Sequence, residues 1–390
     1  MTTMAPPFKV LIVDDEPDME VLVRQRFRRK IRDGEFEFVF THNGQEALEK
    51  LKEDPAIDVV MSDINMPVMD GLTLLSRLSD INRILKAVVV SAYGDMQNIR
   101  IAMNRGAYDF LTKPIDFQDF EVTLNKTIQE LQAIKGGLEA REQLTAIQNE
   151  LNVATRIQQS ILPRIFPPFP GMSEFEIYAA MIPAREVGGD FYDFFLIDNE
   201  RLGFVIGDVS GKGVPAAIFM AVSRTLLKAT ALQGVSPGEC LQYINGVLSR
   251  QSDAAMFVTI FYGILHKNTG EVEYCIGGHN PPYILGKDRL EALDKPAGLI
   301  VGAFEQSTYE TGKFKLKPGD TIFLYTDGIT EARDNHANEL SEQRLIAILE
   351  RTKAGSVEEM VQEVLAEVRR FSAGASQGDD ITALALQYRG

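Results

Sequence analysis

Short apolar runs alternate with amphipathic stretches over roughly the first third of the chain. Five runs have the composition of buried strands, and they lie at residues 9–13, 37–40, 58–62, 87–91 and 109–113. Between them, apolar side chains recur at helical spacing, which predicts helices at 17–32, 44–53, 71–79, 95–105 and from 116 onward. Five successive strand–helix units predict a doubly wound α/β domain at 8–125, with a five-stranded parallel sheet and helices on both faces.

A different pattern occupies residues 116–162. Leucine or isoleucine recurs there, mostly at steps of three, four or seven residues, at 124, 128, 131, 134, 138, 144, 147, 151, 157 and 161. This spacing predicts one long helix with an apolar stripe, and such a stripe is typical of a helix that pairs with a partner helix. We therefore expect a helical coiled-coil linker at 126–165, with a kink near Gly136–Gly137, and a homodimer formed through it. Four prolines between residues 162 and 171 end the helix.

From residue 172 the chain is rich in strand-like runs again, but glycine, proline and asparagine turns now separate them, as in antiparallel hairpins. Helical patterns interrupt or follow these runs at 214–232, 236–252, 341–352 and 356–373. The layout predicts an α+β domain at 170–390, most simply two packed sheets with helices outside.

Composition narrows the class of protein. The 390 residues are 45% hydrophobic and carry a net charge of −15, which is typical of a globular protein of several domains and disfavours a nucleic-acid partner. The longest apolar stretch, 216–232, contains Arg224 and Lys228, so we interpret it as a buried helix rather than a membrane span. Two cysteines in apolar surroundings, and an N-terminus without an apolar signal core, predict a cytoplasmic protein.

Acidic residues follow two strands of the predicted parallel sheet. Asp14 and Asp15 end the first strand and Asp63 ends the third, and these strands are expected to be neighbours. Three crowded carboxylates repel one another unless a hard divalent cation lies among them. Ser91 ends the fourth strand and Lys113 the fifth. Together these groups predict a site for a transferable phosphoryl group rather than a set of solvated strand-end acids.

The same residues, in this order over 8–125, resemble the receiver domain of two-component response regulators. The resemblance implies that Asp63 accepts the phosphoryl group. It also implies that Asp14 and Asp15, with the backbone carbonyl of Asn65, hold Mg²⁺ beside Asp63.

The rest of the receiver pattern concerns the switch. The resemblance implies that Ser91 hydrogen-bonds the phosphoryl group, that Lys113 pairs with it, and that Phe110 is the switching aromatic residue. An ordinary core position is the alternative for Phe110. A cognate histidine kinase or phosphotransfer protein is the implied partner, and nothing in the receiver itself says what the switch controls.

A second set of acids occurs in four stretches of the C-terminal domain, GGDFYD, GDVSGKG, YTDG and GDDIT. Each acid lies at an expected strand end beside glycine, which lets the backbone approach a metal closely. Histidine does not share the pattern, so an all-oxygen site for Mg²⁺ or Mn²⁺ is expected rather than zinc. Four or more carboxylates carry enough charge for two such ions, and a two-metal site suits hydrolysis of a phosphate ester.

These stretches, with GHNPP between them, resemble the PPM-type serine/threonine phosphatases of the bacterial branch typified by the stage II sporulation protein E. The resemblance covers about 170–390 and implies a β-sandwich with flanking helices and two Mn²⁺ or Mg²⁺ ions. The implied catalytic metal ligands are Asp190, Asp208, Asp327, Asp379 and the backbone carbonyl of Val209. Asp380 stands where many members have asparagine. In one interpretation, Asp380 shares the role of metal ligand with Asp379 or replaces Asp379 in it.

The sequence draws attention to four further residues. Arg185 could bind the substrate phosphate or be a surface arginine. His279 could be an acid, although a hydrogen-bonded histidine in a turn is the favoured interpretation. Lys212 is interpreted as a solvated loop residue and Asp193 as a turn former.

The helix at 150–163 resembles the one that precedes the phosphatase core in this branch and transmits its signal. The sequence thus predicts a response regulator whose output hydrolyses phosphoserine or phosphothreonine on a regulatory protein. By resemblance, that substrate is an anti-sigma-factor antagonist. The alternative is a phosphatase-like adaptor that binds a sigma factor or a partner-switching protein, but an adaptor does not need all of the acids. A DNA-binding output is excluded because the chain has no basic domain or helix-turn-helix pattern.

Overall fold

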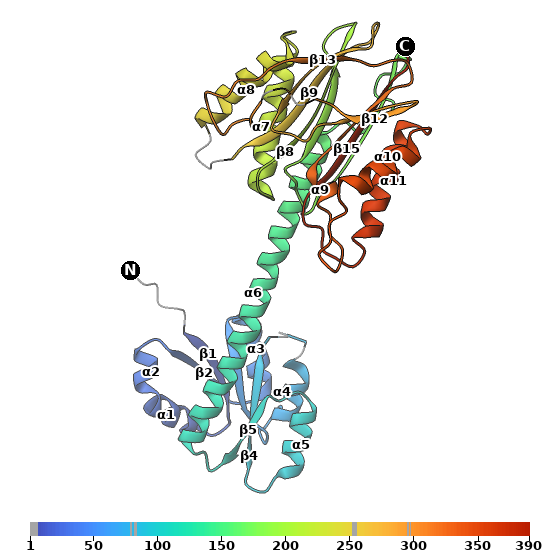
Figure 1. Ribbon diagram of the computed structural model, residues 1–390. Coiled ribbons are helices and arrows are strands. Elements are labelled where there is room, and N and C mark those ends of the chain that lie inside the picture. The colour runs from blue at the N-terminus through green and yellow to red at the C-terminus, as the bar shows by residue number, and fades with distance from the viewer. Residues whose placement is uncertain (1–6, 79, 82–83, 252–255, 295, 297) are drawn as a thin grey trace. The chain divides into compact units, whose positions relative to one another are not determined.

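The computed structural model describes residues 7–390 except 79, 82–83, 252–255, 295 and 297. The last residues of the predicted helices 71–79 and 236–252 therefore lie outside the described residues. The chain forms two compact units, Met1–Ala146 and Ile147–Gly390, and each is described by itself (Figure 1).

The first unit is built on a five-stranded parallel sheet in the order β2-β1-β3-β4-β5. Its strands are β1 (Phe8–Val13), β2 (Phe36–Thr41), β3 (Ile57–Asp63), β4 (Lys86–Ala92) and β5 (Asp109–Lys113). The central strands are almost entirely apolar because both of their faces are covered. The predicted parallel sheet is confirmed.

Helices cover both faces of this sheet, as predicted. They are α1 (Pro17–Arg26), α2 (Arg28–Arg32), α3 (Gly44–Glu53), α4 (Gly71–Leu78), α5 (Met96–Asn104) and the start of α6 (Phe117–Ile161). In β1, Val10 and Ile12 pack with α1 and α6, whereas Leu11 and Val13 pack with α3 and α4. The predicted helix at 17–32 is divided at Phe27, whose buried ring contacts three other phenylalanine rings.

The helix α6 is continuous through Gly136–Gly137. The N-terminal members of its predicted apolar stripe, Leu124, Ile128 and Leu131, are buried in the core of the first unit. They are therefore part of that core rather than of a surface for a partner helix. Farther along, Leu144 and Ile147 are 68% and 55% exposed.

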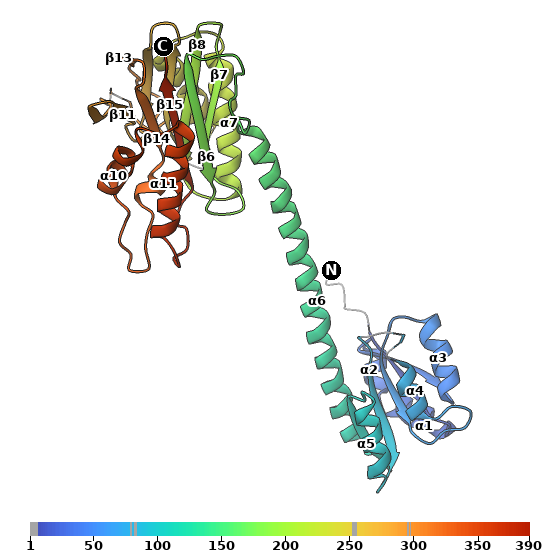
Figure 2. The same cartoon turned by 90° about the vertical axis from the view of Figure 1, so that its right-hand side faces the viewer.

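The second unit contains two five-stranded antiparallel sheets (Figure 2). One, in the order β13-β10-β9-β8-β7, comprises β7 (Phe191–Leu196), β8 (Arg201–Val209), β9 (Val258–His266), β10 (Glu271–Gly277) and β13 (Gly312–Lys315). The other, in the order β12-β11-β14-β15-β6, comprises β6 (Phe175–Ile182), β11 (Tyr283–Gly286), β12 (Arg289–Ala292), β14 (Thr321–Tyr325) and β15 (Ile381–Tyr388). One buried apolar cluster joins the two sheets face to face.

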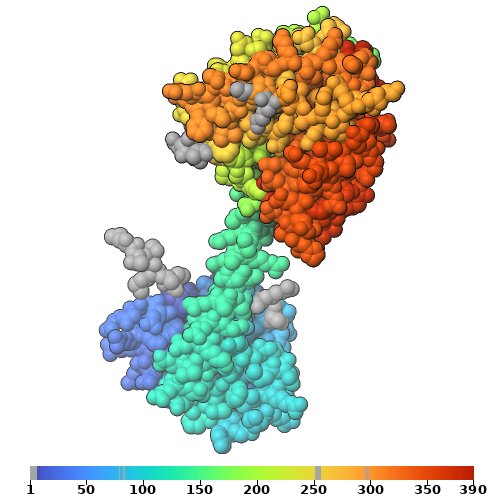
Figure 3. Space-filling model, viewed as in Figure 1, coloured from blue at the N-terminus to red at the C-terminus, as the bar shows by residue number. Residues whose placement is uncertain are grey.

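The remaining helices lie outside the sandwich, which confirms the predicted α+β arrangement. They are α7 (Val214–Ala231), α8 (Pro237–Gln251), α9 (Asp327–Thr330), α10 (Glu342–Thr352) and α11 (Val357–Phe371). Helices α7 and α8 pack on the β8–β9 sheet, and α10 and α11 pack on the β14–β15 sheet. Figure 3 shows the red segment that contains α10 and α11 beside the orange segments of the same unit.

The helix α7 covers the stretch that was predicted to be a buried helix, but only one face of it is buried, and Ile218 and Val222 on the other face are exposed. Within the described residues it has the length and mean hydropathy of a membrane-spanning segment. Its side chains Ala216, Met220 and Leu227 are buried in the apolar cluster between the helix and the sheet.

Candidate functional site

The first candidate site lies at the carboxyl ends of β1, β3 and β5. Because β1 and β3 are adjacent, Asp14 and Asp63 come together, and both are buried. The ammonium nitrogen of Lys113 lies 2.5 Å from Asp63 Oδ2, 3.1 Å from Asp14 Oδ2 and 3.0 Å from Glu16 Oε1. The predicted convergence of these strand ends is therefore present, with Lys113 bonded to all three acids.

The chemistry of this crevice suits a hard cation. One oxygen from each of Asp14, Glu16 and Asp63 lies within 4.8 Å of the other two. Burial, and secondarily the charge of Asp63, raises the pKa of the Asp14 carboxyl group. Burial lowers the pKa of Lys113, but the hydrogen bonds to Asp63, Glu16 and Asp14 outweigh it and raise the pKa overall. These oxygen donors fit Mg²⁺.

One feature of this crevice was not predicted. Glu16, which the sequence pattern did not single out, lies with Asp14 and Asp63 in the carboxylate group, and Asp15 and Glu16 are both exposed. The backbone N–H of Asn65 donates a 3.2 Å hydrogen bond to Asp63 Oδ1, so Asn65 does lie beside Asp63. The only sequence signal for Glu16 was its position directly after the acid pair.

The other two predicted switch residues lie on neighbouring strands, Ser91 near the carboxyl end of β4 and Phe110 near the start of β5. Ser91 is fully buried, and its hydroxyl lies 3.4 Å from Asp95 Oδ2. Phe110 is partly buried and packs against the apolar cluster on the α3–α4 side of the sheet. This packing does not separate the switch interpretation from the core interpretation.

The second candidate site lies at one end of the sandwich in the second unit. Asp190 precedes β7 and Asp208 ends the adjacent β8, while Asp327 follows β14 and Asp379 precedes the adjacent β15. The hydroxyl group of Thr326 donates to Asp190, and the N–H of Gly189 donates to Asp380, so both pairs of strand ends are in contact. Burial raises the pKa of Asp190 and of Asp208, and the charges of the neighbouring acids add to this effect. The four stretches that the sequence singled out thus meet in one place.

Asp190 is the most deeply buried of these acids, with 1% of its surface exposed. Its Oδ2 accepts hydrogen bonds from the hydroxyl groups of Thr326, at 2.7 Å, and Thr382, at 2.6 Å. Burial, and then the charges of Asp208 and Asp380, raises the pKa of Asp190 well above its usual range. Neither threonine was predicted from the sequence, although each stands within two residues of a predicted acid.

The other acids are crowded as well. Burial raises the pKa of Asp208 to about 7, and the charge of Asp327 adds to this effect. Burial, and then the charge of Asp379, raises the pKa of Asp327. Carboxyl groups that raise one another's pKa are stabilised in their ionised form by divalent cations. The donor set therefore fits Mn²⁺ or Mg²⁺.

Asp379 and Asp380 differ in their surroundings. Asp380 is buried, and its Oδ1 accepts from the N–H of Ala184 at 2.7 Å, while its Oδ2 accepts from the N–H groups of Gly189 at 2.6 Å and Asp190 at 3.3 Å. Asp379 is half-exposed, and its carboxylate lies 2.9 Å from the ammonium group of Lys212. Asp380 thus holds the chain before Asp190, whereas Asp379 faces the site.

The glycines before Asp190 are required by close contacts. A Cβ atom on Gly188 would collide with the carboxylate of Asp380, and one on Gly189 would lie 2.9 Å from the backbone oxygen of Val209. The sequence predicted close approach to a metal. In the structure, the glycines allow close approach to a carboxylate and to the predicted carbonyl ligand.

Two further residues from the sequence prediction, Asp193 and His279, are buried and bound to neighbouring groups. Asp193 is buried and pairs with Arg224 at 2.7 Å, so it anchors α7 to the sheet. The buried His279 has Nδ1 2.7 Å from the Thr259 hydroxyl, and its Nε2–H donates to the backbone oxygen of Tyr325 at 3.1 Å. This arrangement agrees with the hydrogen-bonded interpretation of the histidine.

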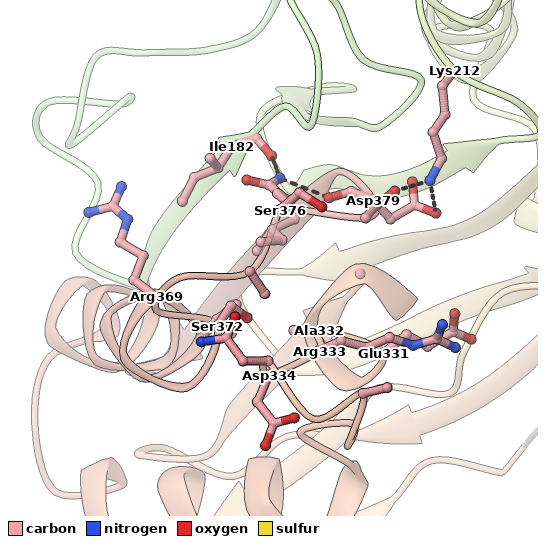
Figure 4. Close-up of a pocket in the computed structure, with 18 residues that line it drawn as sticks. Ile182, Lys212, Glu331, Ala332, Arg333, Asp334, Arg369, Ser372, Ser376 and Asp379 are labelled. Carbon is pink, nitrogen blue, oxygen red and sulfur yellow. Dashed lines mark hydrogen bonds and ion pairs between the residues drawn. The ribbon is translucent and has the colours of Figure 1, made fainter.

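The last two predicted residues lie near the rim of the site. Arg185 is exposed, and its guanidinium lies 3.9 Å from the position that a Cβ atom on Gly213 would occupy. Lys212 pairs with Asp379 and is therefore not a freely solvated loop residue. A cavity of about 790 Å³ is lined by Lys212 and Asp379 and by Arg333 and Arg369. Figure 4 shows these side chains around it.

Raising the pH from about 5 to about 8 in a chelator is expected to lower the melting temperature of the second unit. Asp190, Asp208 and Asp327 have higher pKa values in the folded chain than in the unfolded one, so the folded state binds more protons. The stability that these three groups add to the folded state is fully present when the pH is below the ordinary carboxyl pKa. It is lost as the pH rises through their raised pKa values. Mn²⁺ should restore the melting temperature, most strongly at the higher pH. Calorimetry in chelator checks this, and a pH-independent melting temperature would contradict it.

Two family models match the chain. The model described as response regulator receiver domain matches residues 10–125, and the model described as stage II sporulation protein E (SpoIIE) matches residues 198–389. The Bacillus subtilis chemotaxis protein CheY is 35% identical over 121 residues, which are 31% of this chain and 97% of CheY.

Two further relatives each match 62% of the chain. Protein IcfG of Synechocystis sp. is 32% identical over 62% of this chain, and the match spans 41% of IcfG. Phosphoserine phosphatase RsbU of Bacillus subtilis is 29% identical over 62% of this chain and 71% of RsbU. Among solved structures, the SiaA-PP2C domain of Pseudomonas aeruginosa has a TM-score of 0.57 at 20% identity, covering 63% of this chain and 98% of that domain, which shows a shared fold.

Proposed function

The chain belongs to the response regulators, with an N-terminal receiver domain and a C-terminal phosphatase domain of the SpoIIE family, and on this basis we propose that it is a receiver-controlled, metal-dependent protein serine/threonine phosphatase. The observation that carries the proposal is the convergence of Asp190, Asp208, Asp327 and Asp379 at the ends of adjacent strands of the sandwich, where burial and neighbouring charges raise the pKa values of the first three. A fold used only for binding has no need of such a group, because it destabilises the metal-free protein.

Two Mn²⁺ or Mg²⁺ ions would be held by Asp190, Asp208, Asp327, Asp379 and the backbone carbonyl of Val209. When bound, they supply positive charge that polarises a phosphate ester and favours attack by water. The protein supplies the geometry. Thr326 and Thr382 orient the carboxylate of Asp190, and Asp380 holds the backbone that leads to it.

Two basic side chains complete the proposed site. Arg185, near the rim, would bind the phosphate through its planar guanidinium group. Lys212 forms an ion pair with Asp379 and so neutralises its charge. The cavity beside Asp379 offers room for the polypeptide segment that carries the phosphate.

In the receiver, Asp63 would accept a phosphoryl group from a cognate histidine kinase or phosphotransfer protein. Mg²⁺ would be held by Asp14, Asp63 and the carbonyl of Asn65, with Asp15 or Glu16 as the further acid. Lys113 and Ser91 would contact the phosphoryl oxygens. We propose that this event raises the phosphatase rate.

The proposed substrate is phosphoserine or phosphothreonine on a protein like an anti-sigma-factor antagonist, and the proposed compartment is the cytoplasm. The similarity to RsbU, which is named a phosphoserine phosphatase, supports the substrate class. We further propose a homodimer through the exposed part of the α6 stripe, at Leu144 and Ile147. Light scattering of the wild type against Leu144→Glu tests this, since a charge there should leave a monomer.

The experiment that tests the proposed activity is hydrolysis of a generic phosphoester and of a phosphoserine protein by the full chain. Turnover is expected with Mn²⁺ or Mg²⁺ and none in a chelator. If the phosphorylated wild type releases no phosphate from either substrate with either metal, the adaptor interpretation replaces this one.

A further inference from the structure

The C-terminal turns of α6 contact the loop that leads to Asp190. Gln158 is buried, with 6% of its surface exposed. Its side-chain Nε2 donates to the backbone oxygen of Gly188 at 2.5 Å, and its Oε1 accepts from the N–H of Gly188 at 3.1 Å. One turn earlier, the hydroxyl of Thr155 lies 2.6 Å from the backbone oxygen of Glu186. The helix therefore holds the loop at two successive places.

Asp380 holds the same loop through the next residues. Its carboxylate accepts from the N–H groups of Ala184, Gly189 and Asp190, whereas Gln158 pairs with both backbone groups of Gly188. Gly188 has no side chain of its own to fix its position, and a Cβ atom there would collide with Asp380. The peptide groups just before Asp190 are thus set by hydrogen bonds from Gln158 on one element and Asp380 on another.

We propose that Gln158, assisted by Thr155, is a positioning residue for the metal site. Its side-chain amide is both a hydrogen-bond donor and an acceptor, and both groups bind the backbone of Gly188, two residues before Asp190. Losing them would leave the buried backbone groups of Gly188 unpaired, which releases the loop and with it the carboxylate of Asp190. The inference rests on the proposed function, because it assumes that Asp190 is a metal ligand.

Two variants of Gln158 separate positioning from packing. Gln158→Ala removes both hydrogen bonds. Gln158→Glu keeps the shape and the acceptor but places a carboxylate oxygen against the carbonyl of Gly188. The matched control is Gln148→Ala, an exposed glutamine on the same helix. Both Gln158 variants are expected to weaken Mn²⁺ binding by about 10-fold to 100-fold, the range found when groups that orient metal ligands are removed.

The measurements are Mn²⁺ affinity by calorimetry and amide hydrogen exchange at residues 184–190, on the full chain. Where turnover is present, the half-saturating Mn²⁺ concentration should rise while KM for the phosphoester stays unchanged. Exchange at 184–190 should accelerate in the Gln158 variants and stay unchanged in Gln148→Ala. A structural role alone would instead lower the melting temperature without a selective change in Mn²⁺ affinity.

The outcomes separate this inference from the proposed function. A wild type that binds Mn²⁺ but shows no turnover contradicts the function, while the affinity of the Gln158 variants still decides the inference. If the Gln158 variants bind Mn²⁺ as tightly as Gln148→Ala does, the inference is overturned. Should the Gln158 variants not fold, Thr155→Val, which removes only the hydroxyl near Glu186, decides instead: weaker Mn²⁺ binding supports the inference, and unchanged binding overturns it.

Discussion

Replacing Asp208 or Asp327 by asparagine is expected to reduce metal-dependent phosphate release by about a thousand-fold or more, while making the metal-free protein more stable. Each substitution keeps the shape of the side chain and removes one charge from the proposed metal ligands. In the metal-free protein, that charge is unfavourable, because burial and neighbouring acids raise the pKa of both carboxyl groups. A stabilised but inactive variant distinguishes loss of metal ligands from loss of fold.

Phosphate release with Mn²⁺ and the melting temperature in chelator at about pH 8 measure the two effects. Asp288→Asn is the matched control, because Asp288 is an exposed acid in the turn between β11 and β12. It should change neither quantity. Full activity in Asp208→Asn, or a melting temperature below that of the wild type in chelator, would contradict the assignment.

Asp63→Ala is expected to abolish phosphate uptake by the receiver completely. The wild type should take up phosphate from acetyl phosphate with Mg²⁺, because Asp63 lies beside Asp14 and 2.5 Å from the ammonium group of Lys113, which can neutralise the new charge. Intact-mass spectrometry and peptide mapping locate the phosphate. Asp58→Ala, at the opposite end of the same strand, is the control and should be phosphorylated normally. Phosphate on a serine or threonine of residues 8–125 would count against the receiver assignment.

The sequence predicted the parts of the structure that depend on local pattern. Runs of apolar residues located the five strands of the first unit, and acids at strand ends converge because strand order brings those ends together. In the second unit, the short strands β12 and β13 were not predicted. Periodicity alone could not show which part of the apolar stripe on α6 is buried. Leu124, in the core of the first unit, and Leu144, on an exposed surface, belong to the same helical pattern. Only packing against the sheet distinguishes them.

The contacts that support the proposed metal site could not be predicted from the sequence. Thr382 lies 192 residues from Asp190, and Gln158 lies 30 residues from Gly188, so their hydrogen bonds depend on tertiary register. The adjacent residues Asp379 and Asp380 have the same side chain, but Asp379 pairs with Lys212 whereas Asp380 accepts from the backbone N–H of Gly189. The local sequence does not predict this difference. Glu16 also lies with Asp14 and Asp63, and the run of acids in the sequence does not show which of them approaches Asp63.

The central claim, that a receiver controls a phosphatase in one chain, is tested most directly by one comparison of rates. Phosphate release with Mn²⁺ is measured for the wild type and Asp63→Ala, before and after treatment with acetyl phosphate and removal of its excess. We predict that treatment raises the rate of the wild type and leaves the rate of Asp63→Ala unchanged. Equal rates in the treated and untreated wild type, or the same increase in Asp63→Ala, would contradict the claim.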